Sequence, residues 1–308
     1  MRTTTTALFL VFAVLWGIPS SAERIYTSRD KNGTLVFSDK PMQGSRVLSV
    51  RQVEVTKGSC VSIDKRGDDD NRLLRAINDC YGPVEVRTTR AEAVNVSTNR
   101  PASFTILVPE RSSKDLIQIE RVNPRRGYKY SFTHSMIFGD PRAQHQPPTP
   151  YLLPVPPGQS FPVSQGFHGR ATHTHPQSEY AVDIPMPEGT RLYAVRSGVI
   201  MDIANDFFTG GKGEKFEERA NFIRILHADG TMALYAHLKV ESIQYPTGTR
   251  VSRGQFIAES GNTGYSSGPH LHFAIQKNFG GELRSIPFEF EDRGGSGFTP
   301  EMGMMVAR

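Results

Sequence analysis

The sequence predicts a mainly β protein, and two features indicate this fold class. Short β-rich runs recur along most of the chain, and Gly, Pro and Asn-Gly or Asp-Gly turns separate them. From about residue 160 onward, the chain has neither an internal repeat nor a long amphipathic helix. The 308 residues, 37% of them hydrophobic, are enough for two or three folded domains.

Residues 1–22 predict a cleavable secretory signal. Arg2 precedes an apolar run from Ala7 to Ile18, and small residues follow at Ser20 and Ala22. An uncleaved membrane anchor is the alternative, but the run is shorter than the roughly 20 residues that span a bilayer. We therefore expect an exported mature chain without a stable membrane span, located in the periplasm, at the cell envelope or in the medium.

Charge and cysteine content agree with export. The net charge of +5 suits an anionic surrounding such as a bacterial cell wall. Nucleic acid would match the same sign, but the expected export and the lack of a basic stripe with interleaved aromatic residues argue against it. The only cysteines are Cys60 and Cys80, and we expect a disulfide between them because the exported compartment is oxidising.

Two β parts are expected before the last domain. Residues 23–55 contain two β-rich runs around Asn32-Gly33, the typical signal of a hairpin turn. Residues 56–146 contain four further strand-like runs, at 83–89, 102–108, 115–122 and 128–134, and predict a β-sandwich-like domain. Within it, residues 68–80 are expected to form one short helix capped by the aspartate run at their start, with a Ca²⁺ site in that run as the less favoured alternative.

The last domain is expected over residues 159–290. A proline-dense stretch, 147–158, predicts a semi-rigid linker before it, and residues 291–308 are expected to form a C-terminal tail. The glycine-rich, charged insertion 205–221 predicts a mobile loop at a rim of this domain.

Two histidines one residue apart lie in the strand-like stretch "SSGPHLHFAI". Because side chains alternate along a strand, His270 and His272 point to the same face. They can share a metal ion, or one can bind a metal while the other acts on a substrate. Other histidines crowd the same domain, together with Asp183; these are His168, His173, His175, His227 and His237.

Three segments then carry a resemblance to a known family. "HPQSEYAVDIPMPEGT", "LYAHL" and "SGNTGYSSGPHLHF" occur in that order, and roughly residues 160–280 resemble the LytM/lysostaphin-type zinc metallopeptidases, family M23. The opening hairpin resembles a short DUF4124-type module. The resemblance implies an antiparallel β-sheet peptidase domain, a bound Zn²⁺ and peptidoglycan as the partner and substrate.

The resemblance also implies roles for named residues. Asp183 and His272 match zinc ligands, while His237 and His270 match the pair that assists catalysis. The upstream ligand departs from the simplest pattern, which has His four residues before the Asp, where this chain has Glu179. A longer variant of the pattern resembles "THTHPQSEYAVD". It makes His173 the expected ligand, with His175 and then Glu179 as alternatives.

Several neighbouring residues have weaker expectations. His227 precedes an Ala-Asp-Gly turn and is expected to be a turn or surface residue, and His168 is expected at the edge of the cleft. Residues 265–268 directly precede the HxH pair and are candidates to line a substrate groove.

Together these observations predict a secreted zinc metalloendopeptidase that hydrolyses peptide cross-links of bacterial peptidoglycan. The alternative is a catalytically silent LytM-like regulator that binds the wall or activates another hydrolase. Both a D-Ala–diaminopimelate cross-link and a glycine bridge are candidate bonds, and the N-terminal domains could inhibit or target the peptidase.

Overall fold

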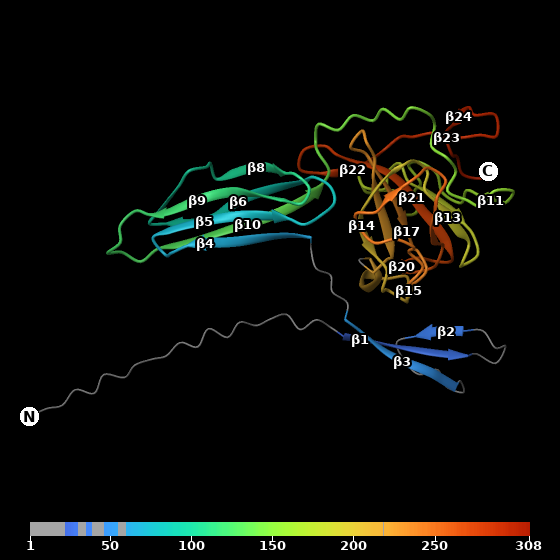
Figure 1. Ribbon diagram of the computed structural model, residues 1–308, viewed down its shortest axis with the longest axis horizontal. Coiled ribbons are helices and arrows are strands. Elements are labelled where there is room, and N and C mark those ends of the chain that lie inside the picture. The colour runs from blue at the N-terminus through green and yellow to red at the C-terminus, as the bar shows by residue number, and fades with distance from the viewer. Residues whose placement is uncertain (1–21, 30–34, 39–45, 55–59, 218) are drawn as a thin grey trace, which may run out of the picture. The chain divides into compact units, whose positions relative to one another are not determined.

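The computed structural model describes residues 22–29, 35–38, 46–54, 60–217 and 219–308 (Figure 1). The chain divides into two compact units, Met1–Lys57 and Gly58–Arg308. The mainly β prediction is confirmed, since strands dominate both units and the described residues contain a single short 3₁₀ helix, Glu214–Phe216. Apart from Ala22, the predicted signal lies outside the described residues.

None of the helices among the described residues has the length and apolarity needed to cross a membrane.

The first unit contains a three-stranded antiparallel sheet. Its strands are β1 (Ala22–Arg29), β2 (Leu35–Ser38) and β3 (Arg46–Glu54), in the order β2-β1-β3. The pairing of β1 with β2, in which Arg29 lies opposite Leu35, is that of the predicted hairpin. The turn residues Asn32 and Gly33 lie outside the described residues.

The second unit begins with two facing sheets. One has the order β4-β5-β9-β7 and the other β10-β6-β8. Their bounds are β4 (Val61–Gly67), β5 (Asn71–Asn78), β6 (Val84–Val94), β7 (Val96–Thr98), β8 (Ser103–Val108), β9 (Ser112–Arg121) and β10 (Lys129–Phe138). Leu74 and Ile117 from one sheet share a buried core with Val86 and Val108 from the other, as in a β-sandwich.

The predicted helix over residues 68–80 is wrong. Most of this segment is strand β5, which pairs with β4 on one side and β9 on the other. Leu74, Ala76 and Asn78 are buried at every second position, which is the period of a strand. Pairing with two neighbours and burial of this face outweigh the local helix preference of the segment.

The aspartate run forms the β4–β5 turn instead of a helix cap. Asp68 Oδ1 accepts hydrogen bonds from the backbone N–H groups of Asp70 and Asn71, at 3.0 and 2.9 Å. Asp69 forms an ion pair with Arg72, 2.9 Å away. The run is therefore explained by turn chemistry and surface charge pairing.

The predicted disulfide between Cys60 and Cys80 is present and closes the β4–β5 hairpin at its open end. Their Cα atoms are 5.1 Å apart, and 20 residues separate them along the chain. Cys80 is buried in the sandwich core.

Removal of this disulfide should destabilise the second unit. A cross-link that closes a loop of about this length lowers the conformational entropy of the unfolded chain and so favours the folded state. We therefore expect the double substitution Cys60→Ser and Cys80→Ser to lower the free energy of unfolding by about 3 kcal/mol. Chemical denaturation followed by circular dichroism measures the change, with the reduced unmodified chain as the matched comparison. An unfolding midpoint unchanged by both treatments would contradict the prediction.

A seven-stranded antiparallel sheet forms the centre of the remaining chain (Figure 1). Its path is β12-β21-β17-β16-β14-β18, and β22 also pairs with β21. The bounds are β12 (Val182–Pro185), β14 (Gly198–Ala204), β16 (Phe222–Leu226), β17 (Met232–Ala236), β18 (Arg250–Val251), β21 (His270–Asn278) and β22 (Leu283–Ile286).

Four two-stranded pairs surround this sheet. They are β11 (Ser160–Pro162) with β25 (Met305–Ala307), β13 (Arg191–Tyr193) with β19 (Phe256–Glu259), β15 (Gly210–Gly211) with β20 (Gly264–Tyr265), and β23 (Phe290–Glu291) with β24 (Gly297–Phe298).

The expected linker and tail pack onto this part of the chain. In the stretch 147–158, Tyr151, Leu153 and Val155 are fully buried in its core. In the stretch 291–308, strand β25 pairs with β11 and buries Val306. Burial of these apolar side chains stabilises the folded state. Both stretches are therefore packed parts of this fold and not extended connections.

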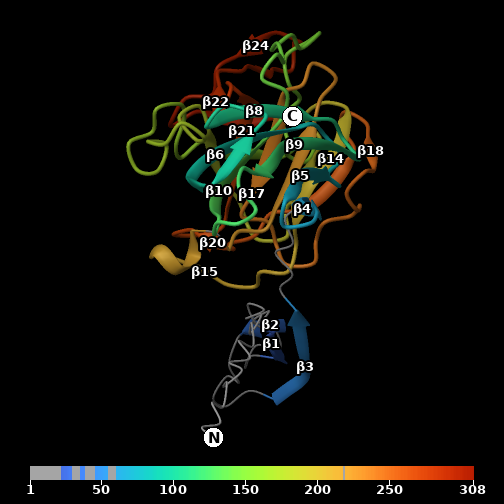
Figure 2. The same cartoon turned by 90° about the vertical axis from the view of Figure 1, so that its left-hand side faces the viewer.

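The sandwich and the seven-stranded sheet share contacts. Met201 and Met232 of the sheet are buried in the sandwich core. The Asn278 side chain donates hydrogen bonds to Glu85 Oε2 at 3.0 Å and to the Gly139 carbonyl at 2.9 Å, and all of these atoms are buried. Figure 2 shows the sandwich strands in front of β14, β17 and β21.

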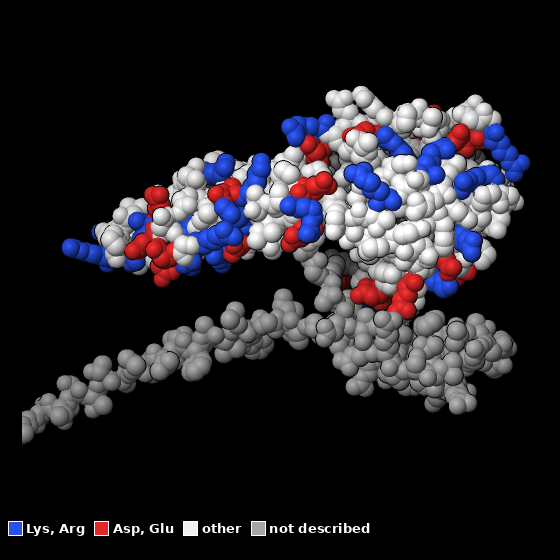
Figure 3. Space-filling view, in the orientation of Figure 1, with Lys and Arg blue, Asp and Glu red and all other residues white. Residues whose placement is uncertain are grey.

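Charges of both signs are distributed over the second unit. Figure 3 shows Lys and Arg interspersed with Asp and Glu over the sandwich, whereas the centre of the adjoining face carries few charges. The net positive charge is therefore not gathered into one uniform basic surface in this view.

Candidate functional site

Strand pairing brings the HxH motif beside Asp183. Strand β21 lies between β12 and β17, with His272 opposite Asp183 on one side and opposite Ala236 on the other. His270 and His272 share one face of β21, as alternation predicts, while Leu271 is fully buried on the other. The residue after β17 is His237, so three strands deliver their functional groups to one place.

His173, Asp183 and His272 form a group that could hold a metal ion. One ligand atom from each residue lies within 4.8 Å of the others. Asp183 Oδ1 is 3.3 Å from His173 Nε2 and 2.9 Å from His272 Nδ1. His173 and Asp183 are 2% and 8% exposed, so the group is largely shielded from water.

One nitrogen of this group has no partner of its own. His173 Nδ1 lies 2.9 Å from the Gly166 carbonyl and donates to it, so Nε2 of the neutral ring keeps a lone pair. Nε2 is buried, faces the Asp183 carboxylate and makes no hydrogen bond. A proton or a metal cation between two such acceptors would satisfy both. Two imidazoles, one carboxylate and an open side are the donor set of a catalytic Zn²⁺.

Gln165 orients the carboxylate. Its Nε2 donates to Asp183 Oδ2 at 2.9 Å, and its Oε1 accepts from the backbone N–H of Ala171 at 3.0 Å. Such partners behind a metal ligand typically set its orientation and affinity. Sequence reasoning missed Gln165, because nothing in "VSQGF" distinguishes it from a surface glutamine.

The alternatives for the upstream ligand lie away from this group. His175 is exposed, and its carbonyl accepts the backbone N–H groups of Ser178 and Glu179. Glu179 Oε1 lies 3.3 Å from His168 Nδ1. The structure thus brings His173, rather than His175 or Glu179, next to Asp183.

His237 and His270 form a second pair at the same place. Their ring centroids are 4.5 Å apart, and His270 Nε2 is 3.8 Å from Asp183 Oδ1. His237 Nδ1 donates to the Thr263 carbonyl at 2.7 Å, and His270 Nδ1 donates to the Gly268 carbonyl at 2.8 Å. Because the Nδ1 protons are used in this way, each neutral ring keeps a lone pair on Nε2.

The surroundings of His237 keep it neutral. Burial lowers its pKa to about 3, with a further lowering from His270 and His272, and the Thr263 carbonyl opposes this only in part. Its φ of 62° lies in the left-handed region, which a residue with a side chain seldom adopts. Such a conformation is typical of a functional position that the surrounding structure constrains.

Asp183 is ionised. Its burial alone would raise the pKa, but contact and charge from His173 and His272, whose nearest ring nitrogens lie 3.3 and 2.9 Å from Oδ1, outweigh burial and hold the pKa of Asp183 far below its usual range. The site therefore combines one carboxylate with imidazoles, which suits a divalent cation.

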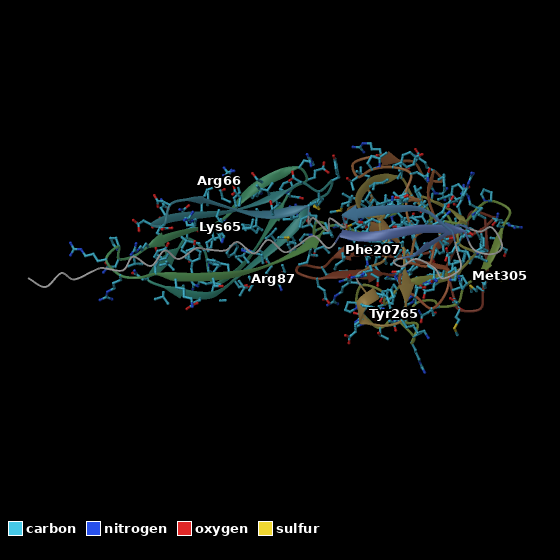
Figure 4. All side chains as sticks on the ribbon, turned by 90° about the horizontal axis from the view of Figure 1, so that it is seen from below. Lys65, Arg66, Arg87, Phe207, Tyr265 and Met305 are labelled. Carbon is cyan, nitrogen blue, oxygen red and sulfur yellow. A yellow bond between two sulfur atoms is a disulfide. The ribbon has the colours of Figure 1, made fainter. Side chains whose placement is uncertain are left out.

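An open groove of about 520 Å³ runs past these groups. Of the expected residues 265–268, Tyr265, Ser266 and Ser267 line it and Gly268 does not, and Tyr265 is labelled in Figure 4. The other lining residues are Ser164, Gln165, Ala171, Thr172, Ser178, Asp183, Lys212, His237, His270 and His272. Lys212 lies in the glycine-rich insertion 205–221. The charged composition of that insertion was the sequence signal that could have identified Lys212 as a groove residue.

His227 is a turn residue, but it is buried. Its carbonyl accepts the Gly230 N–H in the turn, and its Nδ1 donates to the Ser197 carbonyl at 3.1 Å. Burial is the main cause that lowers its pKa to about 4. It lies outside the metal-binding group.

Acid should therefore destabilise the fold through His227. Its pKa is near 6.5 in the unfolded chain and about 4 in the native state, so between these values only the unfolded chain binds the proton. The stability that the neutral, buried His227 contributes is fully present above about pH 6.5. It is lost as the pH falls toward about 4, by up to about 3 kcal/mol. His227→Asn keeps a donor for Ser197 but does not titrate, and urea denaturation from pH 7 to 4 should show a flatter dependence. Equal pH dependence in both chains would contradict the prediction.

Comparisons with known proteins agree with the resemblances. Residues 177–283 match Peptidase family M23, and residues 8–59 match a domain of unknown function, DUF4124. The family match begins after His173, whose place in the group comes from the geometry alone.

Two of the similar curated proteins are endopeptidases. The chain is 32% identical over 123 residues to the peptidoglycan DD-endopeptidase ShyA of Vibrio cholerae, covering 39% of this chain and 26% of ShyA. It is 34% identical over 122 residues to the glycyl-glycine endopeptidase ALE-1 of Staphylococcus capitis, covering 39% and 31%. The chain thus spans about a quarter to a third of the length of these relatives.

Among solved structures, lysostaphin from Staphylococcus simulans is similar, with 30% identity, a TM-score of 0.29 and coverage of 38% of this chain and 43% of that chain.

Proposed function

We propose that this chain is an exported zinc metalloendopeptidase that hydrolyses peptide cross-links of bacterial peptidoglycan. The observation that carries the proposal is the buried, unpartnered His173 Nε2, which faces Asp183 beside the His237–His270 pair. The name of ShyA, a peptidoglycan DD-endopeptidase, supports the substrate class, and that of ALE-1, a glycyl-glycine endopeptidase, supports the cleavage of peptide bonds. The match to DUF4124 leaves the role of the first unit open.

His173, Asp183 and His272 would hold the zinc ion, with Gln165 orienting the carboxylate. When bound, zinc supplies a Lewis acid that polarises a peptide carbonyl and makes water more acidic. The groove leaves one side of the group open toward a substrate.

The imidazole pair handles the proton. Hydrolysis adds the oxygen of water to the carbonyl carbon and needs one proton moved to the leaving amine. His237 or His270 would accept the proton of the attacking water at Nε2, since Nδ1 of each already donates to a backbone carbonyl. The protonated ring can then stabilise the developing oxyanion or donate to the amine.

We also propose revised limits for the parts of the chain. Residues 1–22 act as the signal, 23–55 as the DUF4124-like module and 56–146 as the sandwich. The peptidase part then extends over about 147–308, because the stretches before and after its core pack onto it.

A catalytically silent regulator is the alternative function. It has no need of an open ligand set beside an imidazole pair, and these residues are all present. This chemistry favours the enzyme.

The test combines metal content and products. The purified chain, gently isolated, should carry about one zinc per molecule and release uncrosslinked muropeptides from chemically defined sacculi, identified by mass. Chelation should remove both zinc and release, and added zinc should restore them. A chain that binds no zinc overturns the metal assignment, and a zinc-loaded chain that cuts no wall type overturns the enzyme.

A further inference from the structure

We propose that Lys212 makes the groove selective for peptides that carry a free carboxylate beside the scissile amide. This inference rests on the proposed peptidase function and adds the substrate class. Among the described residues that line the groove, Lys212 is the only Lys or Arg, and Asp183 is the only acid.

Backbone contacts anchor the insertion next to Lys212. Its strand β15 pairs in parallel with β20, and the Ser266 N–H donates to the Gly211 carbonyl at 3.2 Å. Gly211 directly precedes Lys212, and the Ser266 hydroxyl lies 3.3 Å from His270 Nδ1. The cation is therefore tied to the same segment that contacts one member of the imidazole pair.

The far end of the insertion is held equally firmly. The fully buried Asn221 accepts the Phe207 N–H at 2.9 Å and donates to the Phe207 carbonyl at 2.6 Å. Its own N–H donates to Thr263 Oγ1 at 3.0 Å, and the Thr263 carbonyl is the acceptor for His237. Asn221 thus joins the two ends of the expected mobile loop, and the middle of the loop and its last residue contact the segments that orient the catalytic pair.

Lys212 and Lys215 differ in what they contact. Both are exposed, but the Lys215 ammonium lies over the Phe216 ring, 4.8 Å from its centroid, whereas Lys212 joins no ion pair among the described residues. Its charge is available to a ligand in the groove. Lys215 does not line the groove and provides a matched control for the loss of one positive charge.

The rest of the groove suggests what that charge recognises. Most other lining groups are neutral hydroxyls, an amide and imidazoles, which can hydrogen-bond a peptide backbone of any sequence. A single ammonium adds attraction for a carboxylate. In a D-Ala–diaminopimelate cross-link, a carboxylate sits on the carbon bonded to the scissile nitrogen, while a glycine bridge has none there. Lys212 therefore favours the first bond.

The test uses two synthetic D-alanyl-diaminopimelate peptides that differ only in whether this carboxylate is free or a carboxamide. The unmodified chain should cut the carboxylate peptide with about fivefold higher kcat/KM, through KM, which is the scale of one exposed ion pair. Lys212→Met should abolish the preference and Lys212→Glu should reverse it, while Lys215→Met keeps it. Zinc content should be unchanged in all three variants.

A preference that survives in Lys212→Met, or none in the unmodified chain, overturns the proposal. Binding separates this outcome from failure of the proposed function. If neither peptide is cut, calorimetry with His270→Gln compares the two affinities with and without Lys212→Met. If the carboxylate peptide binds more tightly and Lys212→Met removes this difference, the inference about Lys212 holds although the proposed peptidase function fails. Equal affinities for the two peptides would overturn both the inference and the proposed function.

Discussion

His173→Ala should leave the purified chain without zinc and reduce cross-link hydrolysis by about 10³-fold or more, whereas His175→Ala should keep both. Loss of His173 would remove one of the three proposed ligands, and without the ion the chain would lose the several kcal/mol of transition-state stabilisation that a Lewis acid supplies. His175 is exposed and lies outside the group, so its loss removes no ligand.

Elemental analysis and muropeptide release measure the two effects, and Glu179→Gln tests the remaining alternative in the same assays. Thermal unfolding of each variant in the presence of chelator separates loss of metal from loss of fold. Zinc retained by His173→Ala but lost by His175→Ala or Glu179→Gln would transfer the ligand role to that residue.

Strand periodicity explains why part of the site was predictable. The spacing of His270 and His272 is enough to place both on one face of a strand, and the β12–β21 register then sets Asp183 opposite His272. The sequence could favour His173 over His175 as the upstream ligand but could not decide between them. Both lie in an irregular segment, where no strand or helix periodicity shows the direction of a side chain. Its position depends on the hydrogen bond from Nδ1 to Gly166, which no local pattern predicts.

The errors in the fold have a common physical cause. Most of the segment 68–80 forms strand β5 because it pairs with β4 and β9. Residues 147–158 are part of the core because Tyr151 and Leu153 pack against its other apolar side chains. In each case a contact with a distant segment outweighs the local preference. Sequence patterns within a few residues do not contain that contact.

The shared core of sandwich and sheet matters for experiments on the peptidase. Deletion of residues 56–146 would expose Met201 and Met232 and remove the buried partners of Asn278. Such a truncation would lose stability together with any inhibitory or targeting role of the sandwich. Point substitutions in the intact chain are the sharper way to separate catalysis from regulation.

His237→Gln and His270→Gln should each keep zinc and lose about 10² to 10⁴-fold in the rate of cross-link hydrolysis, the usual worth of a positioned acid or base. Neither residue belongs to the metal-binding group. Glutamine is near the size of the ring and can still donate a hydrogen bond toward the Thr263 or Gly268 carbonyl, but it cannot accept a proton from water. Rates with defined muropeptides, measured beside zinc content, give the result.

A silent regulator predicts a different pattern for the same variants. Its wall binding, or its activation of a separate hydrolase, would survive both substitutions, because the proton handled by His237 and His270 has no part in binding. The unmodified, zinc-loaded chain would then release no muropeptide on its own. If instead both variants lose hydrolysis but keep zinc and sacculus binding, the imidazole pair acts on the reaction itself. Unchanged hydrolysis in both variants would remove the pair from the mechanism and leave proton transfer to solvent or to another groove residue.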